Sequence, residues 1–586
     1  MALVEARGVD GHFCTQFMTN STRILEREVP PAAFEKLRAS GLHPVLAKIY
    51  ASRGVLEAAH LVRSLGALLP FDQLLHCATM ANFLAYAIAT EKRILIVADY
   101  DADGATACAV GMLGLQSFGA KVEYLVPNRF EYGYGLTPEI VNLAAGRKPD
   151  FLITVDNGIA SVEGVDEATR LGIQVLITDH HLPGAQLPAA ACIVNPNQHG
   201  CGFPSKHLAG VGVMFYVLVA LRAELRRRDW FSRRKEPNLA ELLDLVALGT
   251  VADVVRLDDN NRILVDQGLR RIRARGARPG IDALLRVAGH DPSRVSTHDL
   301  GFVVGPRLNA AGRLTDMSVG IECLLTQDPT RAAELAKQLD SLNRERRDIE
   351  AGMQETALAL LDKIEVADTC SLSLYDETWH QGVIGILAAR LRERFHRPAV
   401  AFAPADNGEV KGSGRSIPGL HLRDALDLVT KRHPGLILRF GGHAAAAGLT
   451  IRRGDVDAFT VAFEEVVREL VGPGDLERQI ETDGSLLAAD IDLALAEALE
   501  SGIWGQGFLA PVFCDEYEIA EQRVVGGRHL KLRLRAPDSA RTFGAILFGH
   551  DDPLPARIRA VYRVQVNEFR STRSVQLLIQ HWQPAT

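Results

Sequence analysis

Between residues 93 and 180, short apolar runs alternate with longer segments, and this rhythm limits the fold more than any other feature. The runs are rich in Val, Ile and Leu, which is typical of parallel strands buried on both faces. The segments between them carry apolar residues at helical spacing, so a crossover helix is expected after each strand. Strands are expected at 94–98, 122–126, 151–155 and 175–178, and helices at 106–118, 138–146 and 162–171. The sequence therefore predicts an α/β fold built on a parallel sheet.

The rest of the chain indicates further structural parts, because 586 residues are too many for one hydrophobic core. Residues 330–364 form one helical pattern with few breakers, which is typical of a rod that connects two domains. After the segment 471–477, which contains Pro and Gly, short alternating strands predict a small β-barrel. We expect a lead-in at 1–70, the first α/β domain at 71–325, a connecting helix at 326–365, a smaller α/β domain at 366–460 and the barrel at 470–586.

The composition is that of an ordinary globular protein, with 47% hydrophobic and 23% charged residues. Its eight cysteines are scattered and form no CxxC pair, which argues against a zinc ribbon or a disulfide framework and for a reducing compartment. The N-terminus lacks a basic flank followed by an apolar segment, and the longest apolar stretch, 210–221, is too short to cross a bilayer. We therefore expect a cytoplasmic protein without a membrane segment.

The net charge of −7 hides a basic C-terminal segment. From residue 521 to 586 there are 11 Lys and Arg residues against 5 Asp and Glu residues, an excess of +6, which predicts a polyanionic partner. Lys531, Arg533 and Arg535 alternate along one expected strand, so they share a face. Five aromatic residues are candidates for stacking on nucleic-acid bases, with barrel core as the alternative for each: Phe543, Phe548, Tyr562, Phe569 and Trp582.

Acidic residues and histidines follow the apolar runs. Three carboxylates follow the first run in "DYDADG", one follows the third in "TVDNG", and an acid with two histidines follows the fourth in "TDHH". A further apolar run ends in the acid of "LGTVADVV", and we interpret this as a fourth cluster at a strand end. Because ligands bind at the carboxyl ends of parallel strands, we expect these groups to meet in one crevice. They are Asp99, Asp101, Asp103, Asp156, Asp179, His180, His181 and Asp253.

Such a cluster favours bound metal ions, because crowded carboxylates repel one another unless cations neutralise them. Asp and His without Cys suit Mn²⁺ or Mg²⁺, and the imidazole favours Mn²⁺. Two ions can hold an attacking water and a phosphate oxygen during in-line displacement. Taken singly, each Asp could be a helix cap, each His an ordinary surface or core residue, and "DYDADG" a polar turn or a calcium loop, although it lacks the Glu of an EF-hand. Four clusters together are hard to explain in this way.

Glycine-rich segments with basic or hydroxyl side chains are candidates for phosphate binding, since glycine lets backbone N–H groups face an anion. "VPNRFEYGYGLT" contains an arginine suited to bidentate pairing, "GPRLNAAGR" two arginines and an asparagine, "KGSGRS" two serines and an arginine, and "FGGHAAAAG" a histidine. The alternatives are surface or structural arginines and ordinary turns. The candidates are Arg129, Arg307, Asn309, Arg313, Ser413, Arg415, Ser416 and His443.

In this order, the motifs resemble those of the DHH phosphoesterase superfamily, and with the basic terminal segment they resemble the bacterial RecJ family of 5′-to-3′ single-strand-specific DNA exonucleases. The resemblance covers about residues 75–586. It implies a DHH phosphoesterase domain, a DHH-associated domain and an OB-fold-like barrel. It also implies two divalent ions held by Asp101, Asp103, Asp156, His180 and Asp253, with Asp156 bridging them. His181 is expected near the scissile phosphate, Asp99 and Asp179 are expected to orient the ligands, and the expected catalytic group is Asp156, Asp179 and His181.

The resemblance implies hydrolysis of single-stranded DNA from a 5′ end to mononucleotides, in DNA repair and recombination. It also implies a monomer that works with a single-stranded-DNA-binding protein and a helicase. Two alternatives are a DHH phosphoesterase that acts on short oligonucleotides or cyclic dinucleotides, and a non-catalytic DNA-binding scaffold. The long helix and the basic barrel favour a polymeric substrate, and the complete set of carboxylates argues against a scaffold.

Overall fold

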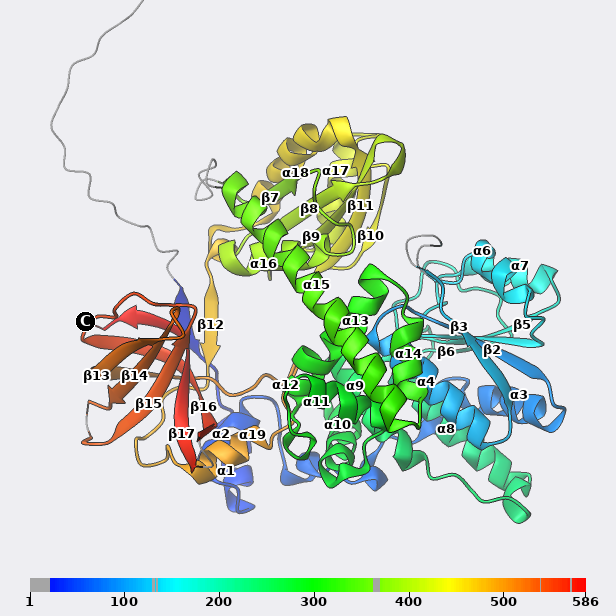
Figure 1. Ribbon diagram of the computed structural model, residues 1–586, viewed down its shortest axis with the longest axis horizontal. Helices are drawn as coiled ribbons and strands as arrows, with labels where there is room; N and C mark the ends of the chain where they lie inside the picture. The colour runs from blue at the N-terminus through cyan, green and yellow to red at the C-terminus, as the bar shows by residue number, and fades with distance from the viewer. Residues whose placement is uncertain are drawn as a thin grey trace, which may run out of the picture. The chain divides into compact units, whose positions relative to one another are not determined.

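The chain forms two compact units in a computed structural model that describes residues 22–128, 132, 135–361, 369–537, 539–569 and 572–585 (Figure 1). The larger unit comprises residues 27–349 and 483–586, and the smaller unit comprises the chain up to residue 26 together with 350–482. Within the described ranges, no helix is both long and apolar enough to cross a membrane.

The larger unit contains a five-stranded sheet in which all neighbouring strands are parallel, in the order β3-β2-β4-β5-β6. The strands are β2 (Arg93–Ala98), β3 (Lys121–Leu125), β4 (Phe151–Val155), β5 (Gln174–Thr178) and β6 (Cys192–Val194). The predicted α/β fold and its four strands are confirmed. The fifth strand, β6, was not predicted, because three residues are too few to show a periodic pattern.

Helices cover both faces of this sheet, as the near-continuous apolar strands predict (Figure 1). Along β2, Ile94, Ile96 and Ala98 belong to one core, and Leu95 and Val97 belong to another. The first core includes α3 (Cys77–Ala89), α4 (Ala102–Ser117) and α8 (Gly210–Arg227), and the second includes α6 (Pro138–Ala145) and α7 (Val162–Arg170). The alternation therefore buries every residue of the strand interior.

The strand order fixes where a ligand can bind. From β2 the chain crosses to β3 on one side and then to β4 on the other side of β2, so the direction of winding reverses between β2 and β4. In open α/β sheets, the crevice at the carboxyl ends of the strands at such a reversal is the usual ligand site. Asp99 follows β2 and Asp156 follows β4, so both lie at this crevice.

A helical layer follows β6, and it corrects one sequence expectation. The apolar run in "LGTVADVV" belongs to α9 (Leu243–Ala252), so Asp253 ends a helix and not a strand. An apolar run buried all round looks the same in a strand and in a core helix, which explains the error. The layer continues through α10 (Asp259–Arg271), α11 (Pro279–Val287), α12 (Thr297–Asp299), the π-helical turn η8 (Leu300–Val304), α13 (Gly305–Leu314) and α14 (Ser318–Leu325).

The predicted long helix is present as α15 (Pro329–Leu361), which begins in the larger unit and ends in the smaller one. The smaller unit has a mixed sheet in the order β10-β11-β9-β8-β7, in which only the pair β7–β8 is parallel among the described strands. A short parallel pair, β1 with β12, belongs to the same unit. The remaining elements are β1 (Arg23–Glu26), β7 (Leu372–Tyr375), α16 (Ile384–Phe395), β8 (Ala399–Pro404), β9 (Glu409–Arg415), α17 (Leu422–Arg432), β10 (Arg439–Gly442), β11 (Ala446–Arg452), α18 (Val456–Leu470) and β12 (Gln479–Thr482).

The C-terminal segment forms the predicted closed barrel, in the order β13-β14-β15-β17-β16. In β14, leucines point into the barrel, and Lys531, Arg533 and Arg535 point outward and are exposed. The stacking prediction is wrong for Phe543 and Tyr562, which are buried in the barrel core. Phe548 is exposed, Trp582 is half-buried, and the side chain of Phe569 lies outside the described part. The strands are β13 (Phe513–Val525), β14 (His529–Arg535), β15 (Thr542–Phe548), β16 (Arg557–Phe569) and β17 (Thr572–Pro584).

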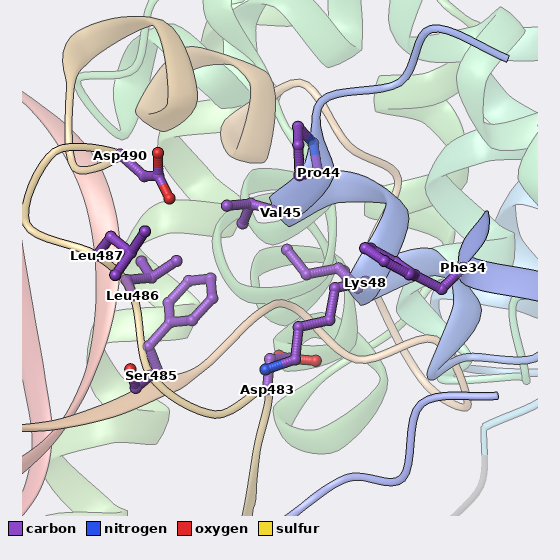
Figure 2. A pocket seen from close by; sticks show the side chains of 11 residues that line it. Phe34, Pro44, Val45, Lys48, Asp483, Ser485, Leu486, Leu487 and Asp490 are labelled. Atoms are coloured by element: carbon purple, nitrogen blue, oxygen red, sulfur yellow. The ribbon is translucent and has the colours of Figure 1, made fainter. Parts of the chain in front are cut away.

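The N-terminal helices α1 (Pro31–Ala39) and α2 (Pro44–Ala51) face the segment that leads into the barrel. Figure 2 shows the resulting pocket, with Val45 and Lys48 on one side and Leu486 and Leu487 on the other. At its base, Asp483 is 1% exposed and accepts hydrogen bonds from both terminal nitrogens of Arg53, at 2.6 and 3.0 Å. The backbone N–H of Val512 donates to the same carboxylate at 3.0 Å.

We expect Asp483→Ala to lower the free energy of unfolding by about 3–5 kcal/mol, because it leaves the buried guanidinium of Arg53 without its partner. The midpoint of urea unfolding, followed by tryptophan fluorescence, measures the effect. Asp551→Ala, at an exposed position of the same unit, is the control and should leave the midpoint within error. Equal midpoints for the two variants would show that the ion pair does not hold these segments together.

Candidate functional site

The "DYDADG" loop links β2 to α4, and Asp101 caps this helix. Its Oδ1 accepts the backbone N–H groups of Asp103 at 2.9 Å and Gly104 at 3.0 Å. A carboxylate is favoured at this position because the first N–H groups of a helix are unpaired and carry partial positive charge. From the other side, Asn309 Oδ1 of α13 accepts the N–H of Ala102 at 2.8 Å. The loop is therefore fixed from two directions.

Asp103 is 1% exposed and ties this loop to the start of α8. Its oxygens accept the backbone N–H groups of Gly210 at 2.5 Å and Val211 at 2.9 Å. A Cβ atom at Gly210 would lie 2.6 Å from Oδ1 of Asp156, so only glycine lets the helix approach this closely. The start of α8 thus borders two of the candidate carboxylates.

Asp156 follows β4 in a strained conformation. Its φ angle is 64°, a left-handed value that is uncommon for a residue with a side chain. Its backbone N–H donates to the carbonyl oxygen of Thr178 at 3.0 Å, which holds the residue beside the end of β5. Strain of this kind is often retained at functional sites. Here it places Oδ1 of Asp156 3.0 Å from Nε2 of His180.

Asp179 orients the two histidines that follow it. Its Oδ1 accepts the backbone N–H groups of His180 at 2.7 Å and His181 at 3.1 Å, and lies 2.8 Å from Nδ1 of His181. Its Oδ2 accepts the N–H of Ile159 at 2.9 Å. Oδ1 therefore has three partners and Oδ2 has one, and the carboxylate fixes the His181 ring.

Asp253 reaches the cluster from the end of α9. Its Oδ2 lies 3.5 Å from Nε2 of His180, and the same nitrogen lies 3.9 Å from Oδ2 of Asp103. Gly249, one helical turn earlier, permits this approach, because a Cβ there would lie 2.9 Å from Oδ1 of Asp103. The imidazole of His180 is thus surrounded by carboxylates from three elements.

The predicted residues come together in three overlapping groups of side-chain oxygen and nitrogen atoms, each within 4.8 Å. Asp156 and His180 each belong to two of these groups, so the groups form one continuous cluster. The groups are Asp156, His180 and His181; Asp103, His180 and Asp253; and Asp99, Asp101 and Asp156. The expectation of one crevice at the strand ends agrees with this geometry, although Asp253 arrives from a helix.

The electrostatics of the cluster suit divalent cations. Burial and neighbouring carboxylates raise the pKa values of Asp103, Asp156 and Asp253. Burial and the nearby charge of His181 lower the pKa of His180 to about 4, so its ring is neutral, as a metal ligand must be. Within the described chain, its buried Nε2 has no hydrogen-bond partner. Carboxylate oxygens with one imidazole and no sulfur match Mn²⁺ or Mg²⁺.

His181 is in the opposite protonation state. Although burial opposes it, the hydrogen bond and charge of Asp179 raise the pKa of His181 to about 9. The pKa of Asp179 is lowered despite its burial, because His181 donates a hydrogen bond to it and carries a favourable charge. The pair is therefore an imidazolium and a carboxylate at neutral pH, beside the carboxylate cluster.

The structure separates the candidates in "GPRLNAAGR". Arg307 is buried, and all three guanidinium nitrogens have partners, two on Asp340 and one on the carbonyl oxygen of Val303. Asn309 supports the metal-site loop through Ala102, whereas Arg313 is half-buried. Arg129 lies outside the described residues. Arg307 and Asn309 thus act within the fold, although the sequence pattern suggested contact with nucleic acid.

In the smaller unit, the "KGSGRS" strand places two candidates beside the first turn of α16. A Cβ at Gly385 would lie 3.0 Å from both Oγ of Ser413 and Nη2 of Arg415, and Nη1 of Arg415 donates to Ser413 Oγ at 3.2 Å. Ser416 is buried and donates to the carbonyl oxygen of Leu420, so it has a structural contact. His443 is exposed. Ser413 and Arg415 thus border a helix N-terminus, a favourable place for an anion.

Sequence reasoning missed two asparagines that hold the histidines. Asn195 Nδ2 donates to the carbonyl oxygen of His181 at 2.9 Å, and Asn197 Nδ2 donates to that of His180 at 2.7 Å. Both follow the unpredicted strand β6 in the sequence "NPN". A polar cluster after a buried strand was the available signal, and it was lost because the strand itself was missed.

Comparison with known protein families assigns three parts of the chain. Residues 93–250 match the DHH family, N-terminal domain; residues 367–469 match the DHHA1 domain; and residues 482–581 match the RecJ OB domain. The first match contains every predicted metal-site residue except Asp253.

Similar proteins and structures give the same result. The single-stranded-DNA-specific exonuclease RecJ of Dickeya dadantii is 53% identical over 555 residues, which cover 93% of this chain and 96% of that protein. The crystal structure of RecJ from Thermus thermophilus in complex with Mn²⁺ superimposes with a TM-score of 0.82 at 29% identity, covering 96% of this chain and 80% of the other. The corresponding Mg²⁺ complex gives a TM-score of 0.76 at 27% identity, covering 96% of this chain and 79% of the other.

We expect Mn²⁺ to raise the melting temperature of the protein, and Asp156→Asn to remove most of that increase. A ligand at 100 times its Kd adds about 2.7 kcal/mol to the free energy of unfolding. Asparagine tolerates the left-handed φ of this position, so the variant should fold. Thermal unfolding of both proteins, recorded with and without Mn²⁺, measures the change in melting temperature.

Without metal, Asp156→Asn should be at least as stable as the original chain, because it relieves repulsion in the cluster. Asp166→Asn, on the exposed face of α7, is the matched control and should keep the full Mn²⁺ effect. An equal Mn²⁺ effect in all three proteins would remove Asp156 from the metal site.

Proposed function

The chain belongs to the RecJ family of single-stranded-DNA-specific exonucleases, and from that premise we propose how it binds and cleaves a strand. It is a metal-dependent exonuclease that acts on single-stranded DNA. We propose further that cleavage proceeds from the 5′ end, releases mononucleotides and uses two divalent ions. The observation that carries this proposal is the cluster of carboxylates and His180 at the winding reversal of the parallel sheet.

The residues that would hold the ions are Asp101, Asp103, Asp156, His180 and Asp253, with Asp156 as the bridging carboxylate. Asp156 supports this role because it belongs to two of the three groups in the cluster. Divalent ions bound there would activate a water molecule and neutralise charge on the phosphate. We propose Mn²⁺ in preference to Mg²⁺, because an imidazole is among the ligands. Asp99 supports the cluster from the loop after β2.

His181 and Asp179 would act on the phosphate side of the cluster. Asp179 holds the ring through Nδ1 and keeps it protonated at neutral pH. An imidazolium in this position can donate a hydrogen bond to a phosphate oxygen and stabilise negative charge that develops there. Asp179 itself, held by backbone N–H groups, works through His181 as its orienting partner.

Basic and hydroxyl side chains in each unit are candidates for binding a single strand. Lys531, Arg533 and Arg535 provide an exposed basic face on the barrel. Further candidates are Arg129, Arg313, Ser413, Arg415 and His443, whereas Arg307, Asn309 and Ser416 have structural partners. The barrel face distinguishes this proposal from a phosphoesterase for short oligonucleotides or cyclic dinucleotides, which has no need of it.

Family membership also leads us to propose a cytoplasmic monomer that acts in DNA repair and recombination, together with a single-stranded-DNA-binding protein and a helicase. These partners follow from the family alone. The convergence of Asp99, Asp101, Asp103, Asp156 and Asp253 in one cluster supports an enzyme over a non-catalytic scaffold.

With Mn²⁺ and a single strand, we expect a 5′ label to be released first, as a mononucleotide, and a 3′ label to be released last. A blunt duplex should remain intact, because its bases are paired and its ends are not separated. Gel electrophoresis over time distinguishes the products. Turnover of a dinucleotide alone would favour the small-substrate alternative, and no turnover of any substrate would favour a scaffold.

Asp156→Asn should bind the strand without cleaving it, and Asp166→Asn should cleave normally.

We expect Lys531, Arg533 and Arg535 changed together to Ala to weaken binding of a single strand. The slope of log K against log salt should fall by about 2, because three phosphate contacts are lost at roughly 0.7 each. Fluorescence anisotropy at several salt concentrations measures the slope. The matched control changes Arg233, Arg234 and Lys235, three exposed basic residues of the same unit, to Ala. An equal loss in both variants would assign the effect to net charge and not to the barrel face.

A further inference from the structure

Phe302 exposes 68% of its surface, although large aromatic side chains normally lie in a core. It belongs to the π-helical turn η8, and its ring stacks on that of the exposed residue His298, with centroids 4.9 Å apart and planes 25° apart. π-helical turns are rare and are frequent at functional sites. The two rings therefore present an open aromatic surface.

The turn η8 is fixed against the end of α9 that carries Asp253. Cβ atoms at Gly301 and Gly305 would each lie 3.1 Å from a side-chain carbon of α9, on the last two residues before Asp253. These glycines are one helical turn apart, so they share the face that meets α9. Phe302 is next to that face and points into solvent. Its ring is thus held close to the helix end that contributes to the metal centre.

The barrel belongs to the same unit and contacts the segment that precedes this aromatic pair. Partial burial lowers the pKa of His298, the charge of Asp299 opposes this shift, and the charges of Arg563 on β16 and of His290 add to it. Nε of Arg563 is buried and has no hydrogen-bond partner in the described part of the chain. An ion pair between Arg294 and Glu568 joins the same strand to the loop before α12. The ion pair therefore holds β16, the strand that carries Arg563, against the segment that leads into His298 and Phe302.

We propose that Phe302, His298 and Arg563 form a nucleotide subsite between the basic barrel and the metal centre. An unpaired base of the substrate stacks on Phe302, and Arg563 binds the adjoining phosphate. The inference rests on the proposed function, because the subsite binds the single strand that is proposed there as the substrate. The bound nucleotide is not the one that carries the reacting phosphate. Phe302 is a positioning residue: it contacts a base and takes no part in cleavage.

This subsite contributes to strand specificity. An aromatic ring accepts any base by stacking on its flat surface, which a Watson–Crick duplex conceals between neighbouring base pairs. A guanidinium beside the ring adds a contact to a phosphate. Because single-stranded and double-stranded DNA both carry phosphates, this contact does not distinguish between them. Selection for unpaired DNA therefore comes from the ring, and retention of the strand comes from both groups.

The test uses 20-nucleotide single strands with one 2-aminopurine at each position in turn, bound without divalent metal so that the strand stays intact. We expect one position to change its fluorescence on binding and to lose that change in Phe302→Ala. With metal, Phe302→Ala should raise KM for the 20-mer about 5- to 100-fold, the range expected for one stacked base, with kcat unchanged. Phe302→Trp should restore both readouts, and Arg563→Gln should lower the salt slope of binding by about 0.7.

A dinucleotide substrate and a second variant separate the outcomes. Phe302→Ala should leave dinucleotide turnover unchanged, and Tyr86→Ala, at an exposed aromatic position on α3, should behave like the original chain on every substrate. An equal loss on the dinucleotide and the 20-mer would show that the change disturbs Asp253, and the subsite would be rejected. A fluorescence pattern and KM that do not change in Phe302→Ala would also reject it. Failure of the proposed function is a different result, because the unaltered protein would then not cleave a single strand.

Discussion

Mutual repulsion among buried carboxylates is the constraint on which the arrangement of the larger unit depends. Asp103, Asp156 and Asp253 lie in surroundings that oppose their ionisation. Backbone N–H groups offset part of this repulsion. Asp101 accepts two of them at the start of α4, and Asp103 accepts two at the start of α8. The partial positive charge of these helix ends lowers the electrostatic cost of assembling the cluster before a cation arrives.

Close approach of the helices is the second requirement, and glycines and one strained residue provide it. Gly210 and Gly249 bring α8 and α9 to distances that a Cβ atom would forbid. Asp156 takes a left-handed φ, so the chain turns sharply at the end of β4 and directs its carboxylate toward His180. The winding reversal of the sheet gives the site its location, and these local features give it its geometry.

Much of this architecture could be read from the sequence, because buried parallel strands leave a strong apolar signal and the acids follow them directly. The strands β2, β4 and β5 and their polar ends were predicted in this way. The role of α9 was not, since a helix buried on all sides has the same apolar run as a strand. Likewise Arg307 looks like an anion-binding residue in a motif, and only the fold shows its partner Asp340, 33 residues later. The inward direction of Phe543 and Tyr562 depends on barrel register, which one sequence does not specify.

The path of the chain through its two units has a consequence for how the protein is made. Arg53 meets Asp483 only after 430 further residues, so the larger unit lacks this anchor until Asp483 has been synthesised. The smaller unit, which occupies residues 350–482 at the end of this interval, has its own sheet and core and can form before the barrel. A ribosome moving at about 5–20 residues per second would therefore leave the metal-site sheet without its barrel for roughly 20 to 80 seconds. During that time the apolar surfaces that later meet the barrel are open to chaperones and to premature association.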